Sequence, residues 1–197
     1  CQVNSVGCES QRANLAVTIN YRPLVPGVVP VVYCQGDTAL ALTASTCSNC
    51  TLYWWDNLTI ASPYVTTPIP STANAGTKTY YVNQISPQGC VGPKTSLLVT
   101  VNPTPLAPIV TNPSICQQNN STLVSPYVAL SANCTYRWYT AAIGGAYSMN
   151  VPSVSLVSVG TFVNYVSQIN NFGCEGPRDL QAITVLPKPL APNLSNV

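Results

Sequence analysis

The chain has 197 residues, of which only 6% are charged, and a net charge of +2 without clustered basic residues. This pattern gives no indication of a nucleic-acid or anionic-membrane surface, since such surfaces need gathered Lys and Arg. No apolar run reaches the roughly 18 residues needed to span a bilayer, so we expect no direct membrane insertion. Nine cysteines without a histidine favour disulfides in an oxidising compartment over Cys/His zinc sites, and we expect no metal and no cofactor.

Three segments of the chain share one frame, in which a Gln lies six residues before a Cys and a Leu lies sixteen residues after it. They are Gln2–Cys8–Leu24, Gln84–Cys90–Leu106 and Gln168–Cys174–Leu190. The equivalent leucines are 82 and 84 residues apart, a period that indicates a tandem array of small domains. We therefore expect the C-terminal end of a preceding repeat over 1–25, one repeat over 26–106, and a second over 107–197 that includes the start of the next linker.

The first complete repeat has the pattern of short β-strands and no helical periodicity. Residues 38–44 alternate with a period of two, which places Leu40 and Leu42 on one face of a strand. The next strand is predicted over 52–55 with Trp54 toward the core, and further strands over 76–84 and 97–101. Prolines at positions 63, 68 and 70 restrict the segment between them to turns and short edge strands.

The second repeat follows the same order of strands, and the N-terminal fragment matches its last strand. The equivalent inward-facing residues are Val128 and Leu130, Trp138, Val166, Ile183 and Val185, and in the fragment Val17 and Ile19. About seven short strands with a Trp on the third predict an all-β fold of tandem immunoglobulin-like β-sandwich domains. Pro-X-X-Pro linkers, such as Pro105 to Pro108, join these domains and are expected to be extended and semi-rigid.

Several short motifs of the chain resemble one family of bacterial surface repeats. The motifs are Tyr33-Cys34-Gln35-Gly36-Asp37-Thr38, Thr79-Tyr80-Tyr81-Val82-Asn83-Gln84, Gly89-Cys90-Val91-Gly92-Pro93-Lys94 and Gly173-Cys174-Glu175-Gly176-Pro177-Arg178. They are similar to the immunoglobulin-like repeats of large Bacteroidetes surface adhesins, including gliding-motility adhesins secreted by the type IX system. The resemblance implies an extracellular or cell-surface protein that is attached to the outer membrane through other parts of its chain. The second repeat departs from the pattern because Gln118 stands where the first repeat has Gly36, which predicts a reshaped turn.

The resemblance also implies a pattern of disulfides. It joins Cys34 to Cys90 and Cys116 to Cys174, with a local bridge between Cys47 and Cys50 and with Cys134 left over. A second pairing, Cys50 to Cys90 and Cys134 to Cys174, would use two loops at the same end of a sandwich. Sequence alone does not decide connectivity, so both pairings remain open.

Aromatic residues provide the candidate contact surface. Strand alternation places Tyr53 and Trp55 of the first repeat, and Tyr139 of the second, on the solvent-facing side. Exposed rings of this kind could stack on a sugar or pack on a neighbouring protein. The competing interpretation is that the Pro63–Pro70 segment covers Trp55.

Catalysis is poorly supported, and we expect no catalytic residues and no enzyme activity. The chain has no His, and its carboxylates lie in turns of separate repeats: Glu9, Asp37, Asp56, Glu175 and Asp179. Thr38, in Asp37-Thr38-Ala39, resembles a Bacteroidetes O-glycosylation site.

From the repeats, the linkers and the low charge we hypothesise a non-catalytic stalk segment of a long repetitive adhesin or extracellular filament, supporting adhesion or gliding motility. Its partners are the neighbouring repeats. The alternatives are a module that binds surface glycans or other cell-surface proteins, and an accessory domain of a secreted enzyme.

Overall fold

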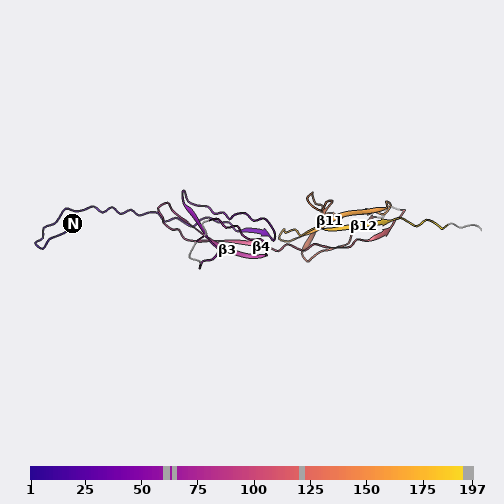
Figure 1. Cartoon of the computed structure of the whole chain (residues 1–197), viewed down its shortest axis with the longest axis horizontal. Helices are drawn as coiled ribbons and strands as arrows, with labels where there is room; N and C mark the ends of the chain where they lie inside the picture. The colour runs from indigo at the N-terminus through magenta and orange to yellow at the C-terminus, as the bar shows by residue number, and fades with distance from the viewer. Residues whose placement is uncertain (60–62, 64–65, 120–122, 193–197) are drawn as a thin grey trace, which may run out of the picture. The chain divides into compact units, whose positions relative to one another are not determined.

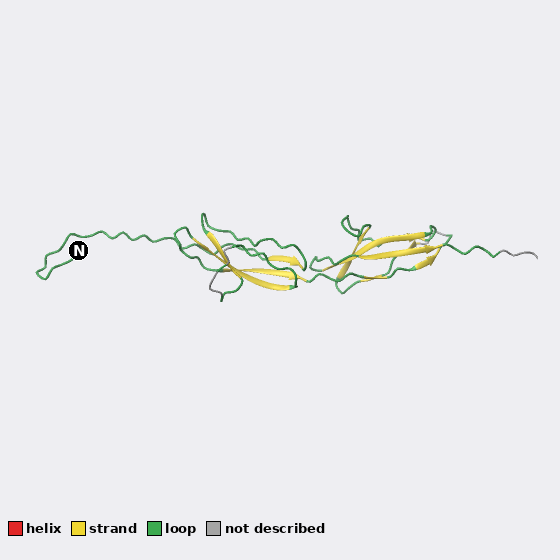
Figure 2. Ribbon diagram, in the orientation of Figure 1, coloured by secondary structure: helices red, strands yellow, loops and turns green. Residues whose placement is uncertain are grey.

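The computed structural model describes residues 1–59, 63, 66–119 and 123–192. Throughout this described part the regular secondary structure is β-strand, as Figure 2 shows by colour, which confirms the all-β fold class. Contacts between Cα atoms divide the chain into two compact units. The first comprises Cys1–Val31, Leu40–Ile69 and Thr79–Leu98, and the second comprises Val32–Ala39, Pro70–Lys78 and Val99–Val197.

The strands before residue 103 form one four-stranded sheet, and Figure 1 labels two of its members, β3 and β4. In order across the sheet the strands are β1 (Val31–Cys34), β4 (Thr95–Asn102), β3 (Gly76–Ile85) and β2 (Thr51–Trp55). β2 runs antiparallel to β3 and pairs Trp54 with Val82. Leu97, Val99 and Val101 of β4 are buried while Leu98 is exposed, which is the alternation of a strand with one face on the core.

The strands after residue 108 form a matching sheet and two small ones. The four-stranded sheet runs β6 (Ser114–Cys116), β12 (Asp179–Leu186), β11 (Gly160–Asn170) and β9 (Cys134–Tyr139). The small sheets pair β5 (Ile109–Val110) with β8 (Val128–Ala129), and β7 (Leu123–Val124) with β10 (Val154–Ser155). β6 is parallel to β12, whereas β9 and β12 are both antiparallel to β11.

The equivalent tryptophans of the two repeats occupy the core, as predicted. Trp54 is 1% exposed and Trp138 is 3% exposed. Trp138 forms a cluster with Val128 and Val166, and a second cluster contains Val154, Leu156, Ile183 and Val185. The predicted inward positions of β12 are therefore confirmed.

Two local predictions were wrong. Residues 38–44 form no regular strand, and Leu40 is 73% exposed although Leu42 is buried. Alternation places both leucines on one face only where a neighbouring strand fixes the backbone. Residues 38–44 carry no ladder: the Leu42 amide donates to the Pro68 carbonyl at 3.0 Å, and the nearest bridge joins Gly27 to Ser45. Val17 and Ile19 are also exposed and lie in a segment without strand structure. In the part of the chain that the structure describes, no helix has the length and apolar character needed to cross a membrane.

Candidate functional sites

The repeated glutamine of the sequence frame binds the linker at the start of its own repeat. In the first unit, the buried Gln84 side chain donates through Nε2 to the Leu24 carbonyl at 2.8 Å. In the second unit, Gln168 donates in the same way to the Leu106 carbonyl at 2.8 Å. A buried amide needs several partners, and the Gln168 Oε1 also accepts from the Ser131 amide at 2.7 Å. The frame found in the sequence is therefore a linker-binding site.

A repeated glycine completes this site by allowing two backbone segments to approach each other. A Cβ on Gly176 would lie 2.4 Å from the Pro105 carbonyl oxygen, and one on Gly92 would lie 3.0 Å from the Pro23 carbonyl oxygen. Both glycines are buried and donate their amides to the Gln carbonyl of the same frame, at 2.8 Å for Gly92 and 2.9 Å for Gly176. Each Pro-rich linker is thus held by a side-chain amide and a close backbone contact.

Glu175 collects three donors and is not the solvated turn carboxylate that the sequence suggested. Arg137 Nη1 lies 2.6 Å from Glu175 Oε2, and Ser167 Oγ donates to Oε1 at 2.6 Å. The Tyr139 hydroxyl also donates to Oε1. Burial by itself raises the pKa of Glu175, but the hydrogen bonds from Ser167, Tyr139 and Arg137 outweigh it, and the net pKa is lowered.

We predict that Glu175→Gln lowers the free energy of unfolding by about 1–3 kcal/mol at neutral pH, because three donors lose their charged acceptor. The pKa of Glu175 is lower in the folded protein, so its contribution is present above the unfolded carboxyl pKa of about 4.3. In urea titrations between pH 7 and pH 3 the difference from wild type should begin to shrink near that value and be lost as the pH falls through the lower pKa of the folded state. Glu9→Gln, at an exposed turn, is the matched control and should change little. An equal effect of Glu175→Gln at every pH would contradict the prediction.

The candidate aromatic contacts are placed differently from the prediction. Trp55 is 7% exposed and Tyr139 is 5% exposed, whereas Tyr53 is half-buried. A cation from the Gly-Pro-Lys/Arg element covers each buried ring: Lys94 Nζ lies 3.8 Å from the centroid of Trp55, and the Arg178 guanidinium carbon 3.1 Å from that of Tyr139. The cation covers one face of each ring, and these contacts were missed because cation and ring are about 39 residues apart in the sequence. Residues 64–65 of the Pro63–Pro70 segment, the alternative cover for Trp55, lie outside the described residues.

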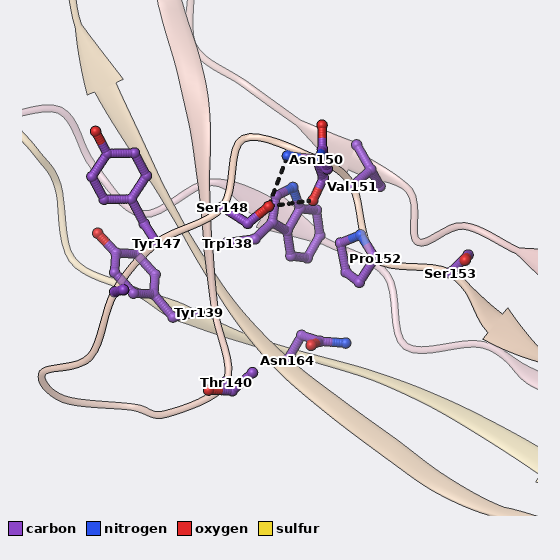
Figure 3. Close-up of a pocket in the computed structure, with 11 residues that line it drawn as sticks. Trp138, Tyr139, Thr140, Tyr147, Ser148, Asn150, Val151, Pro152, Ser153 and Asn164 are labelled. Atoms are coloured by element: carbon purple, nitrogen blue, oxygen red, sulfur yellow. Dashed lines mark hydrogen bonds between the residues drawn. The ribbon is translucent and has the colours of Figure 1, made fainter.

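A cavity of about 420 Å³ lies beside Tyr139 in the second unit (Figure 3). Tyr139 and Tyr147 lie at one side of it, with Ser148, Asn150 and Asn164 among the polar lining groups. Ser148 accepts a hydrogen bond from the Asn150 amide at 3.0 Å and pairs through its backbone with Trp138, which fixes this part of the wall. The Arg137 guanidinium stacks on Tyr147 at 4.2 Å from the ring centroid. The cavity thus combines aromatic faces with neutral hydrogen-bonding groups.

The disulfides differ from both predicted pairings except at the local bridge. Cys47 and Cys50 are bonded, as predicted. Cys34 is bonded to Cys174, with a sequence separation of 140, and both residues belong to the second unit. The pairings Cys34–Cys90 and Cys116–Cys174 were therefore wrong, and so was the alternative with Cys50–Cys90 and Cys134–Cys174. Among the described residues the free cysteines are Cys1, Cys8, Cys90, Cys116 and Cys134.

The remaining site prediction concerns Thr38. Its side chain is exposed, in the segment that follows the turn at Gly36 and Asp37. The local sequence pattern does not indicate the roles of Gln168, Gly176 and Arg178. Their recurrence at equivalent positions in both repeats was the available signal.

The arrangement of the sheets, with a buried Trp on the strand beside the long hairpin strand of each repeat, defines a tandem immunoglobulin-like β-sandwich protein. A family model described as "Ig-like domain CHU_C associated" matches residues 23–103 and again residues 105–187. Because these matches cover most of the chain, the protein belongs to this family of Ig-like domains.

Solved structures with similar arrangements include the fibronectin(III)-like modules of Clostridium thermocellum CbhA, at 13% identity and a TM-score of 0.43, covering 86% of this chain and 96% of that one. Another is the FN1–FN3 segment of chicken CNTN1, at 13% identity and a TM-score of 0.38, covering 82% and 65%. A third is SGBP-B of the Bacteroides ovatus mixed-linkage glucan utilization locus, in complex with a mixed-linkage heptasaccharide, at 15% identity and a TM-score of 0.26, covering 80% and 43%. A comparison with curated proteins finds no match.

Proposed function

We propose that the chain is a non-catalytic stalk segment of a long repetitive cell-surface adhesin or extracellular filament, supporting adhesion or gliding motility. The observation that carries this proposal is the Cys34–Cys174 disulfide, which joins the first strand of one family domain to the turn of the next. A covalent bond between successive repeats suits a protein that transmits load. Its partners would be the neighbouring repeats, at the cell surface.

The use of the repeated residues supports this proposal. Gln168 and Gly176 fasten a linker, and Arg178 covers a ring of its own repeat. Glu175 is held as an ion by three fixed donors, which suits a structural role better than proton transfer. Ig-like domains of this family are generally structural modules.

Single-molecule pulling on the full chain, attached at its two ends, tests the load-bearing role. In the oxidised protein the bond between Cys34 and Cys174 should shield 140 residues from extension. Addition of a thiol reductant should release roughly 480 Å of contour length, at about 3.4 Å per residue. The proposal would be contradicted if the chain extended at the low force typical of a disordered polypeptide. It would also be contradicted if the contour length were the same with and without reductant.

The cavity beside Tyr147 supports a second candidate function, a module that binds surface glycans. Tyr147 is 49% exposed and neutral polar groups line the cavity beside it, a combination suited to stacking and hydrogen bonding with a sugar. If the chain is only a stalk segment, we expect no binding of the protein to any sugar on a glycan array. Binding that is lost in Tyr147→Ala but kept in Tyr127→Ala, a matched exposed tyrosine outside the cavity, would favour the glycan-binding function.

A further inference from the structure

Each repeat has one cysteine equivalent to Cys34 and one equivalent to Cys174, but only Cys34 and Cys174 form the inter-repeat disulfide. Cys116 is the last residue of β6, as Cys34 is the last residue of β1. Cys90 directly follows a turn glycine, as Cys174 does. Cys34 and Cys174 are bonded, whereas Cys116 and Cys90 are free. Each repeat therefore presents one first-strand cysteine and one turn cysteine.

The backbone around Cys116 is held in the same frame as the backbone around Cys34. The amide after each cysteine donates to the last sheet strand, Gln35 to Asn102 and Gln117 to Leu186, both at 2.8 Å. The next amide donates to equivalent carbonyls, Gly36 to Thr72 at 3.0 Å and Gln118 to Leu156 at 2.9 Å. The two glutamine side chains also make equivalent bonds, Gln35 to Ala73 at 2.9 Å and Gln117 to Val157 at 2.7 Å. The replacement of Gly36 by Gln118 thus leaves these contacts intact.

The turn cysteines share a second frame. In each turn the cysteine carbonyl accepts at 3.0 Å from the residue four positions earlier, Ser86 for Cys90 and Asn170 for Cys174. The side chain of that residue accepts from the cysteine amide, at 3.1 Å in Ser86 and 3.0 Å in Asn170. Gly89 and Gly173 have φ values of 81° and 83°, which a Cβ would disfavour. Cys90 is therefore presented in the same way as the bonded Cys174.

The first-strand cysteine is more exposed where it is free than where it is bonded, and so is the turn cysteine. Cys174 is 0% exposed and Cys34 is half-buried, whereas Cys116 is exposed and Cys90 is half-buried. The backbone of the exposed Cys116 is held by the same contacts as the backbone of the bonded Cys34. Cys116 is therefore positioned to bond to a turn cysteine like Cys174.

We propose that Cys116 is the site of a second inter-repeat disulfide, formed with the turn cysteine of a following repeat of the same type in the same polypeptide. Cys90 has the complementary role toward the first-strand cysteine of a preceding repeat. The inference rests on the repeat geometry and holds whether or not the protein is an adhesin. It makes each repeat a covalent link in a continuous series.

The oxidant required is a small-molecule disulfide such as oxidised glutathione. The Cys116 thiolate attacks it and releases one glutathione, and the turn-cysteine thiolate then attacks the mixed disulfide and releases the second. The two cysteine thiols lose two electrons and two protons in total, and these reduce one oxidised glutathione to two thiols. Attachment in one chain favours this partner over a second molecule through a high effective concentration.

The test uses the full chain extended by one repeat, with residues 1–190 followed by residues 107–197. The junction keeps the Leu-Ala-Pro linker sequence, since Ala107 and Pro108 correspond to Ala191 and Pro192. Phe172→Leu in the added copy, at a position that is 58% exposed, gives its turn peptide a distinct mass that oxidation of Met149 on the same peptide cannot mimic. The protein is refolded in reduced and oxidised glutathione, digested with trypsin without reduction, and analysed by mass spectrometry.

We expect the tagged turn peptide to be linked to the peptide that contains Cys116, in the same yield as the untagged peptide linked to Cys34. Cys116→Ser should abolish the tagged link and keep the untagged one, whereas Cys134→Ser, on the same tryptic peptide, should keep both. A free tagged thiol in a sample that contains the Cys34–Cys174 link would overturn the inference. Absence of the Cys34–Cys174 link would also overturn the inference, because the inference is argued from that bond. A Cys116 link found only between two separate molecules would overturn it as well.

Discussion

Replacement of Trp138 with alanine should lower the free energy of unfolding of the second repeat by about 3–5 kcal/mol. The side chain is 3% exposed and packs against Val128 and Val166, with the Tyr136 ring 6.2 Å away between centroids. The loss combines the transfer of a large apolar surface with the cavity that remains, because the β9–β11 ladder prevents the walls from closing fully.

Urea unfolding followed by far-UV circular dichroism measures this effect. Trp138→Phe should cost less than Trp138→Ala, because the benzene ring fills part of the cavity. Trp54→Ala, at the equivalent and equally buried position, should destabilise the first repeat by a similar amount. A loss below about 1 kcal/mol for Trp138→Ala would show that the indole is not a core element.

The second large effect should come from Cys34→Ala combined with Cys174→Ala. The disulfide closes a sequence separation of 140, and chain entropy assigns a loop of this length about 5 kcal/mol for unfolding both repeats together. Both cysteines are replaced so that no thiol remains to exchange with Cys90 or Cys116. The double variant should unfold at lower denaturant concentration.

The matched control for this prediction is Cys47→Ala with Cys50→Ala. This bridge spans a sequence separation of 3, so the same chain-entropy estimate assigns it only about 2 kcal/mol. Its loss should affect the first repeat alone. Equal effects of the two double variants, or a larger effect of the short bridge, would contradict the entropic origin of the stabilisation.

The sequence by itself determined the features that depend on local pattern. Strand alternation and the repeat frame were sufficient to predict an all-β sandwich with Trp54 and Trp138 in the core. The Cys47–Cys50 bridge was implied by the family resemblance, in one of two pairings that the sequence left open, and the structure confirms it. The repeated Gln and Gly were visible as a pattern, although their linker-binding role was not.

The tertiary structure decided what depends on residues distant in the chain. Cys90 and Cys174 share the local motif Gly-Cys-X-Gly-Pro, so only the tertiary structure showed that Cys34 bonds to the turn of the other repeat. Trp55 looked exposed from alternation, yet Lys94 lies over its ring. Leu40 looked buried, yet its segment has no strand ladder to orient it. In each case the deciding partner lies outside the local segment, and the period of a strand carries no information about which distant group will cover a side chain or bond to it.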